Sequence, residues 1–327
     1  MFVPNYAHIG VTLRSLLLCL LCFWLAGCSA VMNKELHVPV ISDTETLRTI
    51  EQQKAGLEPV DNGERMKNLS ASDHLGRGQD ALSRGDVSLA RLHFTLALAK
   101  DDNLLAAYLG LGETLLQKGK RHEAKTVLKK ALLKDGNDVR ILARLGVLCR
   151  TLEEYEEALA FLEKANDLEP DNVWLMTELA ISYEKSGEVK KAEGYFTRAS
   201  ELLQSSAVAL NNLGFNYLLQ GRCGEAIPVL EKALKRAPDN IITMNNLALA
   251  YAFNHDERKA LQLFESSVGK AEAYNNLGYL LMLQEQYEEA RLALSRALEL
   301  NPHFYVRASE NLELLKNNGS GKHKLFD

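Results

Sequence analysis

The chain has little of what marks several common classes of protein. Among its 327 residues are only 5 cysteines and 2 tryptophans, and the net charge is −5. A nucleic-acid binder needs a basic face, and this charge balance argues against one. The apolar stretch near the start, Ser15–Leu25, has eleven residues. A helix that spans a membrane needs roughly 20, so this stretch does not predict one.

Motifs for catalysis and for metal binding are also missing. The sequence has no Ser/His/Asp set and no HExxH zinc motif, and outside the apolar stretch near the start it has no CxxC or His/Cys cluster. Gly321-Lys322 near the end resembles part of a phosphate-binding loop, but Lys316 stands where the first glycine is required and no strand precedes it. We therefore expect no enzymatic activity and no cofactor.

Small residues recur about every 34 residues between residues 71 and 304. One series is Ala90, Ala124, Ala158, Ala192, Ala226, Ala260 and Ala290; a second, seven residues later, is Ala97, Ala131, Ala165, Ala199, Ala233, Ser267 and Ala297; a third is Gly78, Gly112, Gly146, Ala180, Gly214, Ala248 and Gly278. Such a period with helical spacing inside each unit is typical of an α-solenoid of helix pairs. The small residues are expected where paired helices cross closely.

The pattern resembles that of the tetratricopeptide repeat (TPR) family. In the clearest unit, 207–240, Gly214, Tyr217, Gly221, Ala226 and Pro238 stand where the family's pattern expects them. The resemblance implies an all-α fold: a right-handed α-solenoid of TPR helix pairs with about seven repeats and a C-terminal capping helix. We place the repeats at 71–104, 105–138, 139–172, 173–206, 207–240, 241–270 and 271–304, with the cap at 305–316.

The turn inside each repeat is marked as well. Gly85, Gly119, Gly187 and Gly221 share one repeat position, which Glu153, His255 and Glu285 fill in the other repeats. The sixth repeat is four residues short and ends at Gly269, which predicts a helix C-cap there.

The first 28 residues resemble a bacterial lipoprotein signal. Arg14 precedes the apolar stretch Ser15–Leu25, and Leu25-Ala26-Gly27-Cys28 resembles a lipobox. The resemblance implies cleavage after residue 27, acylation of the Cys28 thiol, and, with Ser29 rather than Asp next, an outer-membrane anchor that faces the periplasm of a Gram-negative bacterium. The alternative is an ordinary cleaved signal with an incidental cysteine.

The remaining segments connect or end the array. We expect residues 28–70 to comprise the lipidated Cys28 and a flexible tether. As a coil, this tether would span about 35 Å from end to end. Residues 317–327 are expected to be a disordered tail. Cys149 and Cys223 lie two repeats apart, too far for a disulfide, so we expect two unpaired thiols.

A partner-binding groove is predicted on the first helices of the last three repeats, since first helices line the groove in this fold. The predicted residues are Asn212, Phe215, Leu219, Asn246, Leu249, Phe253, Asn276, Tyr279 and Leu283. Asparagine amides can both donate to and accept from an extended peptide backbone. The equivalent positions of repeats three and four are charged, for example Arg144 and Glu184. The alternative is that the asparagines bond neighbouring helices and the apolar residues pack between repeats.

Residues 200–316 resemble more specifically the TadD-like lipoproteins of tight-adherence (Tad, or Flp) pilus systems. The lipobox, the repeat number and the shortened sixth repeat agree with this family. The resemblance implies a non-enzymatic, pilotin-like scaffold whose partner is the outer-membrane secretin or another pilus-assembly protein.

Two other interpretations stay open. One is a different TPR lipoprotein adaptor, either a type IV pilus pilotin or a recruiter of cell-wall hydrolases. The other is an enzyme with a cryptic site in the solenoid, which nothing in the sequence favours.

Overall fold

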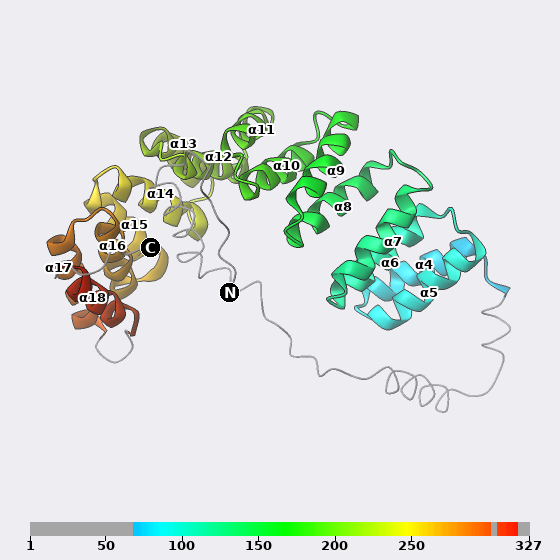
Figure 1. Ribbon diagram of the computed structural model, residues 1–327, viewed down its shortest axis with the longest axis horizontal. Coiled ribbons are helices and arrows are strands. Elements are labelled where there is room, and N and C mark those ends of the chain that lie inside the picture. The colour runs from blue at the N-terminus through cyan, green and yellow to red at the C-terminus, as the bar shows by residue number, and fades with distance from the viewer. Residues whose placement is uncertain (1–67, 302–305, 320–327) are drawn as a thin grey trace, which may run out of the picture. The chain divides into compact units, whose positions relative to one another are not determined.

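The computed structural model describes residues 68–301 and 306–319 (Figure 1). Within these ranges it contains fifteen α-helices and no strand. The helices are α4 (Ala71–Ser83), α5 (Val87–Lys100), α6 (Leu105–Gln117), α7 (Arg121–Leu132), α8 (Val139–Thr151), α9 (Tyr155–Leu168), α10 (Val173–Lys185), α11 (Val189–Leu202), α12 (Ala207–Leu219), α13 (Cys223–Arg236), α14 (Ile241–Phe253), α15 (Glu257–Val268), α16 (Lys270–Leu283), α17 (Tyr287–Leu300) and α18 (Val306–Gly319). The all-α prediction is confirmed.

The described residues divide into two compact units, 68–175 and 176–319, with the division inside α10. Within each unit, helices that follow one another in the chain pack together in pairs, as Figure 1 shows for α4 with α5 and for α16 with α17. The signal sequence and most of the predicted tether lie outside the described residues, as do residues 320–327 of the predicted tail. Residues 317–319, predicted as part of the tail, instead end the helix α18.

Close helix crossings explain the recurring small residues. The seven alanines of the first series are completely buried. A Cβ added to Gly146 would lie 2.4 Å from Leu162, and one added to Gly214 would lie 2.5 Å from Leu230. Gly78 and Gly278 meet Phe94 and Leu294 in the same way. In each case the facing residue follows sixteen positions later, so one crossing geometry repeats along the chain.

The turn position adopts a left-handed backbone in all seven repeats. The four glycines there have φ between 72° and 88°, while Glu153, His255 and Glu285 have φ of 62°, 60° and 61°. Only glycine enters this region without strain. The three non-glycine residues therefore have a strained backbone conformation, which the turn between the helices imposes.

Capping side chains begin many of the helices. Ser70, Asp86, Asp138, Ser206 and Asn240 each accept a hydrogen bond from a backbone N–H in the first turn. Each such cap contributes about 1 kcal/mol. The helix α16 starts differently, because Gly269, with φ 90°, is at once the C-cap of α15 and the N-cap of α16.

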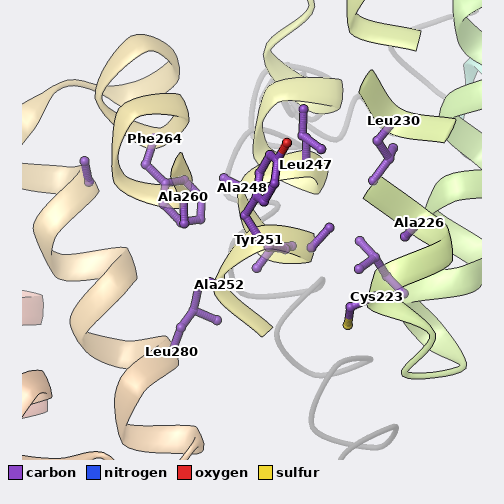
Figure 2. Packing of buried hydrophobic residues seen from close by; sticks show 14 residues of the cluster. Cys223, Ala226, Leu230, Leu247, Ala248, Tyr251, Ala252, Ala260, Phe264 and Leu280 are labelled. Carbon is purple, nitrogen blue, oxygen red and sulfur yellow. The ribbon is translucent and has the colours of Figure 1, made fainter. Parts of the chain in front are cut away.

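One buried cluster of the second unit joins repeats five, six and seven. Leu247, Ala248 and Tyr251 of α14 lie between Leu230 of α13 and Phe264 of α15 (Figure 2). At the end of the unit, Ala308 and Leu315 of α18 cover the buried residues of α16 and α17. The last helix therefore gives the seventh repeat the neighbour that it would otherwise lack.

Candidate functional site

All nine predicted groove residues lie on α12, α14 and α16, within the unit 176–319. We call this surface the first-helix face. The asparagine pairs 211–212, 245–246 and 275–276 fall at equivalent places on its three helices. Helical geometry brings each pair to the same side of its helix as the aromatic or aliphatic residue that follows one turn later.

Several of these asparagines bond to neighbouring elements. Asn246 Nδ2 donates to Asn211 Oδ1 at 3.0 Å, joining α14 to α12. Asn245 Oδ1 accepts from Ser267 Oγ at 2.6 Å, and Asn275 Oδ1 accepts from Asn311 Nδ2 at 3.1 Å. These bonds are of the kind that the alternative interpretation expects.

Asn212 and Asn276 remain accessible to a ligand. Both are half-buried. Among the described residues Asn212 has no side-chain partner, and Asn276 accepts only a long bond, 3.5 Å, from its neighbour Asn275. Their amides therefore keep most of their hydrogen-bonding capacity.

The apolar members of the first-helix face also differ in exposure. Leu219 and Leu249 are 7% and 3% exposed and belong to the interior. Phe215, Phe253, Tyr279 and Leu283 pack against the same core but are only partly buried. Burial raises the pKa of Tyr279. The structure thus leaves a smaller surface than the sequence suggested, made of Asn212, Phe215, Phe253, Asn276, Tyr279 and Leu283. Whether it binds a peptide stays a prediction.

A polar junction next to this face was not predicted. Asn216 of α12 is fully buried, and its Nδ2 donates to Glu184 Oε1 of α10 at 2.8 Å and to the Val189 carbonyl at 3.1 Å. Its Oδ1 accepts from Gln220 Nε2 at 2.8 Å. Burial raises the pKa of Glu184 to about 7, although the bond from Asn216 acts against that shift. The only sequence signal was a third asparagine, four residues after the pair 211–212, in a mostly apolar helix.

One group in the first unit has the composition of a metal site. Cys149, Glu154 and Glu157 place their ligand atoms within 4.8 Å of one another. Lys125, however, donates to both carboxylates, and burial raises the pKa of Cys149 to about 12, which keeps the thiol protonated. The group is therefore a lysine-centred ion-pair cluster that ties α7 to α9. Cys149 and Cys223 are both free, as predicted.

Family models match most of the repeat array. Three models, each described as a tetratricopeptide repeat, match residues 81–145 and 151–211, residues 205–269 and residues 271–304. The matched segments exceed half of the chain, and segments 205–269 and 271–304 span the helix pairs α12–α15 and α16–α17. The chain belongs to the tetratricopeptide repeat family. TPR proteins are typically non-catalytic, and their repeats form scaffolds for protein–protein interaction.

Solved TPR structures show the same fold. A TPR protein from Parabacteroides merdae is 20% identical, with a TM-score of 0.58 over 76% of this chain and 99% of its own. The C-terminal part of a TPR protein from Cytophaga hutchinsonii is 15% identical, with a TM-score of 0.57 over 73% and 99%. No curated protein sequence matches the chain.

The lipid-anchor prediction concerns residues outside this part of the structure. Cys28 and the lipobox precede residue 68 and are not described. Of the helices that the structure describes, none is both long enough and apolar enough to span a membrane.

Proposed function

We propose that this TPR protein is a lipid-anchored scaffold on the periplasmic side of the outer membrane that assists assembly of a Tad/Flp pilus. The observation that carries the proposal is the combination of a lipobox ending at Cys28 with a TPR array behind a tether of about 40 residues. The resemblance of residues 200–316 to TadD-like lipoproteins supports the choice of system.

Membrane attachment would raise the local concentration of the scaffold near its membrane-bound partners. A diacylglyceryl group on Cys28, joined by further acylation, anchors a protein stably because each buried methylene contributes about 0.8 kcal/mol. A tethered scaffold then meets membrane-bound partners at a high effective concentration without any additional contact. Changing Cys28 to alanine should release the protein from the membrane and impair piliation. Full piliation by the soluble variant would contradict the proposal.

Partner capture is assigned to the exposed part of the first-helix face. Asn212 and Asn276 would bond an extended segment of the partner, and Phe215, Phe253 and Tyr279 would contact its apolar side chains. Asn246 serves as a matched internal control, because its amide already bonds Asn211. The double change of Asn212 and Asn276 to alanine should weaken partner binding with little loss of stability. Asn246→Ala should instead lower stability by about 1–2 kcal/mol, since it leaves Asn211 without its donor.

Site-specific photocrosslinking identifies the partner. Crosslinkers at Phe253 and Tyr279 would report on the first-helix face, and one at Leu292, which is 63% exposed on α17, is the control. Capture of the Flp-pilus secretin from the first two positions alone is the expected result. Capture of a type IV pilus secretin or of cell-wall hydrolases would retain the scaffold function and overturn the Tad assignment.

A further inference from the structure

A second surface suited to a ligand lies among the second helices of repeats five and six. A hollow of about 650 Å³ opens between α13 and α15 over α14. Leu247 and Tyr251 of α14 line it, whereas Phe253 is the residue of the same helix that stays accessible on the first-helix face. Residues two positions apart on a helix are separated by about 200° around its axis, so Phe253 lies on the opposite side of α14 from Tyr251. The hollow and the predicted groove are separate surfaces.

The floor of the hollow is apolar. It is formed by Leu234 of α13, Pro238 in the connection after that helix, Leu263 of α15, and Leu247 and Tyr251 of α14. Tyr251 also lies beside Leu247 in the close view of this core (Figure 2). A floor of this kind favours a large apolar side chain, since covering it removes carbon surface from water.

The charged groups at the rim are unequally compensated. The Tyr251 hydroxyl donates to Glu231, and Lys259 lies 4.6 Å from the centre of the Tyr251 ring while pairing with Asp256 at 3.2 Å. Lys235, also at the rim, has no ion-pair partner among the described residues. Of the basic residues in this part of α13, only Lys235 lines the hollow, so the rim offers one unpaired positive charge beside the apolar floor.

The hollow occurs where the array is shortened. A four-residue connection, 237–240, follows α13, but Gly269 alone separates α15 from α16. Ser266, three residues before Gly269, lines the hollow. The shorter α15, with 12 residues against 14 in α13, thus ends beside the hollow.

We propose that this hollow binds an acidic segment of a partner protein, distinct from whatever the first-helix face binds. One large apolar side chain of the segment rests on Leu234, Leu247 and Leu263. A carboxylate next to that side chain pairs with Lys235. Charge complementarity therefore selects a protein segment with Asp or Glu beside a Leu or Phe.

Peptide selection on the full-length protein tests the assignment. A phage-displayed library of random 12-residue peptides is panned on the wild type and counter-selected on Leu263→Asp. We expect enriched peptides with acidic residues flanking an apolar one, and at least tenfold weaker binding to the exposed-site variant Lys235→Glu. Replacing an acidic residue of the peptide with lysine should restore binding to Lys235→Glu. Failure to enrich such peptides would overturn the proposal.

A groove variant separates this site from the proposed function. Binding of the selected peptides should persist when Asn212 and Asn276 are changed to alanine. Loss of binding in that variant, together with unchanged binding to Lys235→Glu, would assign the peptides to the first-helix face and refute the second site. Circular dichroism of Leu263→Asp establishes that its helices remain folded. If the helices of Leu263→Asp are unfolded, the binding of the selected peptides to Lys235→Glu alone tests the proposal.

Discussion

Three repeats have a strained residue at the turn, and this strain leads to a prediction about the free energy of unfolding. His255 has φ 60° and an exposed side chain, so glycine would relieve the strain without losing a contact. We expect His255→Gly to raise the free energy of unfolding by about 0.5–1 kcal/mol, because the gain at positive φ exceeds the entropy added to the unfolded chain. Urea unfolding would measure the change.

The matched control is the opposite kind of change, from glycine to a larger residue, at the same position of another repeat. Gly221 has φ 72°, and an added Cβ would meet nothing within 4 Å. Gly221→Ala should therefore destabilise the protein by about 1 kcal/mol through backbone strain alone. Equal stability of Gly221→Ala and the wild type would show that the turn does not require a left-handed backbone.

The second residue-scale prediction concerns the carboxyl group of Glu184. Its pKa is raised from 4.5 to about 7, so the folded state holds the proton more tightly than the unfolded state. The contribution to stability is then complete below pH 4.5 and is lost as the pH rises towards 7. Glu184→Gln should remove this loss, raising stability at pH 8 by up to roughly 3 kcal/mol.

An exposed glutamate provides the comparison. Glu225 pairs with Arg222 at the surface, and this bond lowers its pKa. Its contribution is lost only as the pH falls below about 4.5, so Glu225→Gln should leave the profile between pH 5 and 8 unchanged. Hydrogen exchange in α10 and α12 across this range measures both variants. A wild type whose protection factors in these helices do not change from pH 5 to 8 would refute the shift of Glu184.

At the scale of the helices, the crossing of two paired helices is the feature most sensitive to an increase in side-chain volume. Gly214 of α12 faces Leu230 of α13, and a Cβ at Gly214 would lie 2.5 Å from Leu230 Cγ. Gly214→Ala should destabilise the protein by about 1–3 kcal/mol, because the two helices must separate or Leu230 must leave its rotamer. Urea unfolding followed by circular dichroism would measure the loss.

Gly194 tests whether the effect comes from packing rather than from helix propensity. It lies inside α11, where an added Cβ would meet nothing within 4 Å. Gly194→Ala should stabilise the protein by about 0.5–1 kcal/mol, as expected in an open helical position. Equal effects of the two substitutions would remove the explanation given for the recurring small residues.

At the scale of the whole molecule, the final helix supports the repeat before it. Leu315 and Ala308 cover the buried Leu277, Leu281 and Leu294, and Asn311 bonds Asn275. A chain ending at Asn301 should therefore lose hydrogen-exchange protection in α16 and α17 first, since each repeat of a solenoid depends on its neighbours. A chain ending at Gly319 keeps the helix and is the control. Unchanged protection in the shorter chain would contradict a capping role.

The position and pairing of the helices could be predicted from the sequence because they depend on local signals. Gly214 and Ala226 mark a crossing within one repeat, and Gly221 marks the turn between its two helices. The same residue types recur with the period of the array, so each repeat supports the helix positions predicted for the next. The close match of the helix pairs to this pattern follows from that redundancy.

Only the tertiary structure decided which residues of the first-helix face a ligand can reach. Asn212 and Asn246 occupy the same repeat position, yet Asn246 bonds Asn211 of the preceding repeat and is buried. Glu184 and Asn216 meet across 32 positions of sequence. The period determines where a side chain starts, but its exposure and pKa depend on which side chains the neighbouring repeats place against it. Those neighbours differ from repeat to repeat, most of all around the shortened sixth repeat.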